Sequence, residues 1–191
     1  MRAIIAAAVL GLLAGVAFGG EWTHANIPIP SAASVRIDGA IGADEYGFKI
    51  TDPKTGIEIL AAADSTTLYM ALKSPGAGWL AIGFGSSGMN GSVMVIALGD
   101  GRGKWKVEQH QGRSFYRHSP VDKPNLVSAA AWQTDGRTCM EFAIPLRFSG
   151  DKSVSAAGPT PFILAYHKSN GAPSKHSKRS SGTLMLKPAA K

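Results

Sequence analysis

The residues after position 19 contain no long hydrophobic stretch with the 3.6-residue period of a helix. Short runs rich in apolar and β-branched residues recur instead, separated by Gly, Pro, Asp and Ser. In the run 66–74, Leu68, Met70 and Leu72 occupy alternate positions, which is the pattern of a strand with one face in a core. The chain is therefore predicted to be all-β.

About ten strands are expected, near residues 34–38, 56–64, 66–74, 78–84, 92–98, 104–110, 113–118, 125–134, 137–145 and 161–168. Asp100–Gly101 and Asp135–Gly136 lie between consecutive strands and favour hairpin turns. The polar, basic segment 168–182 is predicted to be a loop before a last short strand at 183–186. Many short strands joined by tight turns indicate an antiparallel, immunoglobulin-like β-sandwich.

The N-terminus has the pattern of a secretory signal peptide: Arg2, an apolar run at 3–18, and small residues at Ala17 and Gly19. The run is shorter than the roughly 18 apolar residues that a membrane span needs. We expect a signal peptide at 1–19, an N-terminal extension at 20–34, the sandwich at 35–187 and a C-terminal tail at 188–191. The expected location is the periplasm or the extracellular space.

Cys139 is the single cysteine, so the chain can form neither an internal disulfide nor a C-x-x-C-H covalent haem site. The formal net charge of +7 falls by one when Arg2 leaves with the signal peptide. Nucleic acid is not the expected target of an exported chain without a basic helix or an aromatic-interleaved platform. An acidic protein partner or an anionic surface fits the charge better.

The stretch GWLAIGFGSSGMNGS, residues 78–92, contains Gly83-x-Gly85-x-x-Gly88, which matches the dinucleotide-binding pattern. In that fold the third glycine opens a helix whose N-terminus holds the pyrophosphate. Here a strand pattern follows at 92–98, so a nucleotide site is excluded. The small residues on this strand instead allow a second sheet or a flat ligand to approach the backbone.

Three stretches of the chain resemble the DOMON superfamily, in particular its haem b-binding branch. They are RIDGAIGADEY (36–46), GWLAIGFGSSGMNGS (78–92) and FILAYHKS (162–169). The resemblance extends from about residue 35 to residue 186, and the superfamily includes the cytochrome domain of cellobiose dehydrogenase and the haem subunit of ethylbenzene dehydrogenase. Many members carry disulfides, which this chain lacks, and this favours a bacterial periplasmic branch.

The resemblance implies a non-covalent haem b with one Met and one His as axial ligands. By position in the motifs, these are Met89 and His167. Trp79, Phe84 and Tyr166 are implied as pocket residues, and Lys168 as a propionate partner. Taken alone, Met89 also fits core packing, and a histidine at a strand end also fits a hydrogen-bonded structural role.

With both axial positions filled, the implied function is one-electron transfer by an exported b-type cytochrome, not catalysis. Its redox partners would be separate proteins that present an acidic patch to the basic surface and to the segment 168–182. No membrane span is expected after signal cleavage.

Two alternatives from other classes remain open. An iron-free carbohydrate-binding sandwich would use aromatic side chains as a stacking platform, for which the candidates are Trp105, Trp132, Phe115 and Tyr116. A copper carrier would use methionine and histidine donors, for which the candidates are Met89, Met94, His110 and His118. The histidines at 24, 110, 118 and 176 lie in polar or terminal contexts and are expected to be solvated.

Overall fold

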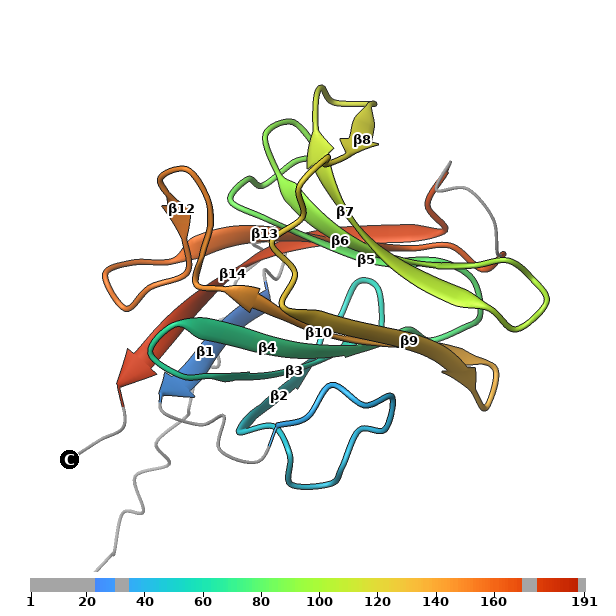
Figure 1. Cartoon of the computed structure of the whole chain (residues 1–191), viewed down its shortest axis with the longest axis horizontal. Coiled ribbons are helices and arrows are strands. Elements are labelled where there is room, and N and C mark those ends of the chain that lie inside the picture. Colours follow the sequence, from blue (N-terminus) through green and yellow to red (C-terminus); the bar gives the residue numbers. More distant parts are fainter. Residues whose placement is uncertain (1–22, 30–34, 170–174, 189–191) are drawn as a thin grey trace, which may run out of the picture.

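A computed structural model describes residues 23–29, 35–169 and 175–188. The described residues form a β-sandwich without helices, as Figure 1 shows. The predicted signal peptide lies outside the described residues.

A seven-stranded sheet and a five-stranded sheet form the two layers. The first has the order β1 (Thr23–Ile29), β14 (Lys178–Pro188), β13 (Thr160–Tyr166), β5 (Leu80–Phe84), β6 (Val93–Gly99), β7 (Trp105–Gly112) and β8 (His118–Pro120). The second has the order β2 (Phe48–Thr51), β3 (Glu58–Ala63), β4 (Thr67–Lys73), β10 (Arg137–Pro145) and β9 (Ser128–Thr134). A two-stranded ribbon, β11 (Arg147–Ser149) and β12 (Lys152–Ser153), lies beside them.

The main core lies between the two sheets and follows from strand alternation. Leu68, Met70 and Leu72 of β4 point into it, as predicted, together with Phe142 of β10 and Phe84 of β5. Asp135 and Gly136 both have positive φ in the β9–β10 turn, which is the conformation that an Asp-Gly hairpin favours. The all-β sandwich predicted from the sequence is therefore confirmed.

Several boundaries differ from the prediction. Residues 23–29, expected to lie in an extension, form β1 and pair in parallel with β14. The chain at 35–38 is not a strand, and residues 113–117 form the turn between β7 and β8. β14 begins at Lys178, so part of the expected basic loop is strand; residues 170–174 of that loop lie outside the described residues.

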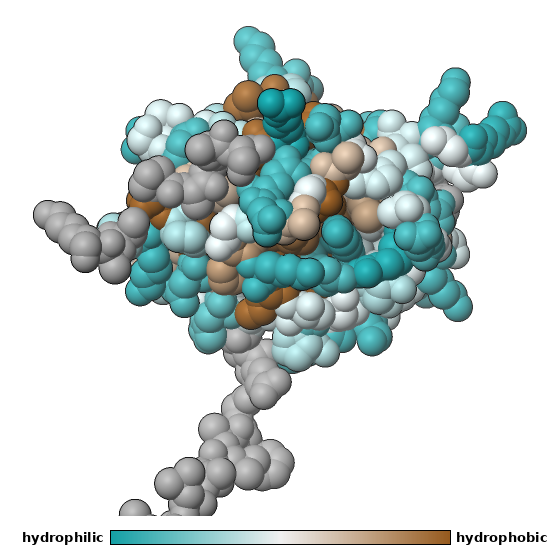
Figure 2. Space-filling view, turned by 90° about the horizontal axis from the view of Figure 1, so that it is seen from below, coloured by the Kyte–Doolittle hydropathy of each residue, from teal (hydrophilic) through white to brown (hydrophobic). Residues whose placement is uncertain are grey.

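The stretch 36–46 forms a structural clamp on the five-stranded sheet. The carboxylate of Glu141 on β10 is fully buried and accepts hydrogen bonds from the Tyr46 hydroxyl at 2.8 Å and the Gly39 amide at 3.1 Å. Burial, more than any neighbouring charge, raises the pKa of Glu141 to about 7. Figure 2 views the molecule from below the orientation of Figure 1 and shows a mostly hydrophilic surface, with small hydrophobic areas between polar side chains.

Candidate functional site

The seven-stranded sheet is apolar on both faces in its centre. Every residue of β5 and β6 is buried, whereas an antiparallel sheet usually has one polar, solvated face. The face that points away from the main core carries a second apolar cluster of Trp79, Ala81, Met94, Ile96 and Leu98, against which Met89, Ile163 and Ala165 pack. This outer cluster is an apolar face that needs a ligand or another segment to cover it.

A pocket that is partly open to solvent lies on the outer cluster. Its walls are predominantly apolar. We call it the outer-face pocket. Its lining residues are Trp79, Ala81, Ile82, Gly83, Met89, Met94, Ile96, His118, Ile163, Leu164, Ala165 and His176. The chemically distinctive ones are a methionine in the loop after β5 and two histidines.

The loop that carries Met89 is tightly held. The Met89 carbonyl accepts hydrogen bonds from the Ser92 amide at 3.1 Å and the Ser92 hydroxyl at 2.7 Å. The Gly91 amide donates to the Gly112 carbonyl at 3.1 Å, and the Lys152 ammonium donates to the Gly91 carbonyl. A Cβ on Gly112 would lie only 1.7 Å from the Met89 carbonyl oxygen, so glycine is required there.

The other end of the outer-face pocket is built around Trp79. Its indole lies edge-on to the imidazole of His176 at a centroid distance of 6.0 Å. The ring of His167 stacks on the same indole at 6.3 Å with an interplanar angle of 14°. His176 lines the pocket, whereas His167 does not and receives a 3.0 Å hydrogen bond on Nδ1 from the Ser169 amide. The pocket therefore brings Met89 together with His176.

The electrostatic environment keeps the pocket histidines neutral. Burial lowers the pKa of His176 below its usual value, and the positive charge of Arg179 lowers it further. Burial also lowers the pKa of His118, with smaller contributions from His110 and His176. At pH 7 both imidazoles can thus offer an unprotonated nitrogen to a metal.

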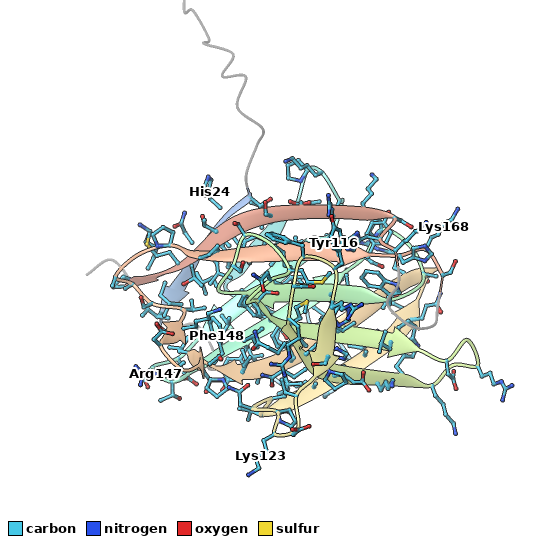
Figure 3. The ribbon with its side chains drawn as sticks, turned by 90° about the horizontal axis from the view of Figure 1, so that it is seen from above. His24, Tyr116, Lys123, Arg147, Phe148 and Lys168 are labelled. Atoms are coloured by element: carbon cyan, nitrogen blue, oxygen red, sulfur yellow. The ribbon has the colours of Figure 1, made fainter. Side chains whose placement is uncertain are left out.

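The remaining residues expected at the site lie elsewhere. Phe84 is fully buried on the core face of β5, because it has the same parity as Leu80 and Ile82. Tyr166 packs against that same core cluster. Lys168 is exposed at the periphery of the molecule, and its amide donates to the Ser177 hydroxyl at 3.1 Å (Figure 3). Trp79 is the one aromatic of the three expected that lines the pocket.

The expectation of solvated histidines is wrong for three of the four. His110 is only 5% exposed and hydrogen-bonds to both Glu108 and His118. His118 and His176 are half-buried in the pocket wall. The burial of His118 was not predicted from the sequence because this residue follows a polar hairpin turn. The burial of His176 was not predicted because that residue follows a basic, serine-rich segment typical of solvated loops.

The four aromatic residues of the carbohydrate alternative lie in two separate places. Trp105 and Trp132 are half-buried and line a separate hollow beside the β9–β10 turn. Phe115 and Tyr116 are 73% and 92% exposed at the tip of the β7–β8 hairpin, which protrudes from the sheet in Figure 1. Among the described residues, no three His, Cys, Asp or Glu side chains are arranged to hold a metal ion.

Comparison with known proteins places the fold. No protein-family model matches the chain, and no curated protein matches its sequence. The cytochrome b domain of pyranose dehydrogenase from Coprinopsis cinerea aligns with a TM-score of 0.54 at 14% identity, covering 71% of this chain and 79% of that domain. The cytochrome domain of Myriococcum thermophilum cellobiose dehydrogenase aligns with a TM-score of 0.52 at 14% identity, covering 73% and 81%. The chain shares the fold of cytochrome b domains.

A more distant likeness is to a family 9 carbohydrate-binding module from Caldicellulosiruptor kristjanssonii, solved with cellotriose. It has a TM-score of 0.49 at 10% identity and covers 88% of this chain and 95% of the module. At these identities the comparisons establish the fold alone. No helix among the described residues is long and apolar enough to cross a membrane.

Proposed function

We propose that this protein is an exported b-type cytochrome that transfers single electrons through a non-covalent haem b in the outer-face pocket. The observation that carries the proposal is the pairing, in one apolar pocket, of a methionine after β5 with a histidine beside Trp79 at the start of β5. When bound, the haem supplies one-electron chemistry, and a Met/His ligand pair gives a higher reduction potential than two histidines.

The residues of the pocket fit such a group. Ala81 and Ala165 add little side-chain bulk to the sheet surface, and the side chains of Met94 and Ile163 fill the space over Gly83 as apolar walls. The indole Nε1 of Trp79 is buried without a hydrogen-bond partner in the described residues, as expected of a polar atom left for a ligand. Thioether sulfur and imidazole nitrogen are both established axial donors.

His176 is the histidine that we propose as the second axial ligand. The resemblance between motifs implied His167 for this role, but His167 stacks outside the pocket lining and its Nδ1 accepts a backbone hydrogen bond. His167 would then support the indole of Trp79 from outside. Substitution of each histidine in turn distinguishes the two assignments.

The redox partner in this proposal is a separate protein with an acidic docking patch. Four exposed basic residues lie close to His176 in the sequence: Lys168, Lys175, Lys178 and Arg179. Contacts between such residues and an acidic partner are screened by salt, so electron exchange should slow as ionic strength rises. The predicted signal peptide places this exchange in the periplasm or outside the cell.

Titration of the purified protein with haemin, monitored by absorption, tests the proposal. We expect saturation at one haem per chain and, after dithionite reduction, the sharp bands of a low-spin six-coordinate b-type haem. A protein that ignores haemin but is retained by immobilised oligosaccharide would favour the carbohydrate-binding alternative, for which the hollow lined by Trp105 and Trp132 is the candidate site.

Filling the pocket should block haem binding without harming the sandwich. Ala165 lines the outer-face pocket, and Ala165→Leu places extra carbon atoms where the proposed haem lies. We expect its haemin affinity to fall by about tenfold or more, because a rigid ligand cannot repack around added volume. Ala129→Leu, at an exposed position of β9, is the matched control and should bind haemin as the wild type does. Equal affinities for all three proteins would contradict the site.

A further inference from the structure

The outer-face pocket contains a third donor residue, His118, which belongs to a hydrogen-bonded chain of three side chains. Nδ1 of His118 lies 2.9 Å from Nδ1 of His110, and Nε2 of His110 lies 3.0 Å from the Glu108 carboxylate. Glu108 is also paired with Lys106 at 2.8 Å. The chain thus connects a charged carboxylate on the face of β7 to the pocket wall on β8.

The Glu108 carboxylate orders the hydrogen bonds along this chain of side chains. Lys106 and His110 lower the pKa of Glu108, so its carboxylate is ionised and can only accept. His110 therefore donates from Nε2, and in this tautomer its Nδ1 is an acceptor. His118 then donates from Nδ1 and its Nε2 is unprotonated, and no group of the described residues hydrogen-bonds to that nitrogen.

An imidazole fixed in this way has the arrangement of a metal ligand. Metal-ligating histidines generally donate their other N–H to a carboxylate, a carbonyl or another acceptor, which orients the ring and makes the bare nitrogen more basic. His110 provides that acceptor, and Glu108 in turn orients His110.

The position of His118 relative to the Met89 loop follows from the strand register. In the β7–β8 ladder His118 is the register partner of Gly112. Gly112 is the residue at which an added Cβ would lie 1.7 Å from the Met89 carbonyl oxygen, and its carbonyl accepts from the Gly91 amide of the Met89 loop. His176 is in contact with Trp79, before the start of β5. The backbone of β8 at His118 is therefore connected to the Met89 loop through Gly112.

We propose that His118 is an alternative iron donor that could take the place of Met89, held in a ligand-competent orientation by His110 and Glu108. The inference rests on the proposed function. If His118 held the iron in place of Met89, a nitrogen donor would replace a sulfur donor and the oxidation state of the iron would not change. Because imidazole stabilises oxidised iron better than thioether does, the form with His118 would have the lower reduction potential.

The test compares Met89→Ala with three double variants, each loaded with haemin and examined by absorption and redox titration. We expect Met89→Ala to remain low-spin with a lowered potential, because His118 takes the vacant position. Met89→Ala with His118→Ala should become high-spin. Met89→Ala with His110→Ala should give a mixture, because His118 loses its orientation. Met89→Ala with His24→Ala, which alters an exposed histidine on β1, should match Met89→Ala.

Two results would overturn the proposal for His118 alone: a high-spin Met89→Ala protein, or a Met89→Ala, His118→Ala protein that remains low-spin. Wild-type protein that takes up no haemin would reject the proposed function and this inference together. The wild-type titration therefore separates failure of the cytochrome assignment from failure of the donor assignment. Circular dichroism of each variant confirms that the sandwich is intact.

Discussion

Replacing Gly112 with Ala is expected to displace Met89 from the pocket and to lower the free energy of unfolding by about 2–4 kcal/mol. The added Cβ would lie 1.7 Å from the Met89 carbonyl oxygen and 3.2 Å from the Ser92 hydroxyl. Both contacts involve the hydrogen bonds that close the Met89 loop, so the loop must move. The haem-loaded variant should lose the sulfur-to-iron charge-transfer band and show a changed potential.

Gly88→Ala is the matched control for this prediction. Gly88 lies in the same loop, has no atom within 4 Å of an added Cβ, and is not among the glycines with positive φ. Its stability should change by less than about 0.5 kcal/mol, and its haem spectrum should be unchanged. If Gly112→Ala and Gly88→Ala behave alike in denaturation and in spectra, the close packing of the Met89 loop on β7 is refuted.

Glu141→Gln is expected to remove a pH dependence of stability that amounts to about 3 kcal/mol. The pKa of Glu141 is raised from 4.5 to about 7 in the fold, so the folded chain retains a proton that the unfolded chain releases at lower pH. The contribution of Glu141 to the free energy of unfolding is fully present below about pH 4.5 and is lost as pH rises through 7. The amide of Gln resembles the protonated acid and does not titrate.

Urea denaturation of both proteins between pH 4.5 and 8 checks this prediction. Other carboxylates, including Asp52 and Glu58, have lowered pKa values and affect stability with the opposite sign. The wild-type minus Glu141→Gln difference cancels their contributions. This difference should decline from pH 4.5 to 7 and then level off. A difference that is constant with pH would show that Glu141 titrates normally and that burial does not determine its pKa.

Much of the fold could be predicted from the sequence because strand alternation and turn dipeptides are local signals. The strand 137–145 was predicted at its observed bounds, and Asp135–Gly136 at its observed turn. β1 was missed because its sequence, THANIPI, contains a proline and is not typical of a central strand. It is held by tertiary contacts instead: its parallel register with β14 requires Gly182, where a Cβ would lie 2.2 Å from the Thr23 carbonyl.

The site could be predicted only in part, because the pocket is made by segments far apart in the chain. Met89 and Trp79 were identified from the glycine-rich stretch 78–92, and both line the pocket. Phe84 was expected in the pocket but lies in the main core, because an all-apolar strand shows no alternation from which its inward face could be read. His118 and His176 gave no local signal, since only the packing of β8 and of the segment before β14 against the sheet places them in the wall.

We propose that the outer-face pocket holds haem iron between Met89 and His176. The most direct test is the dithionite-reduced absorption spectrum of haemin-loaded wild type beside His176→Ala and His167→Ala. We expect a low-spin spectrum for wild type and for His167→Ala, and a high-spin or haem-free protein for His176→Ala. A low-spin spectrum in His176→Ala that is lost in His167→Ala would contradict this assignment and make His167 the iron ligand.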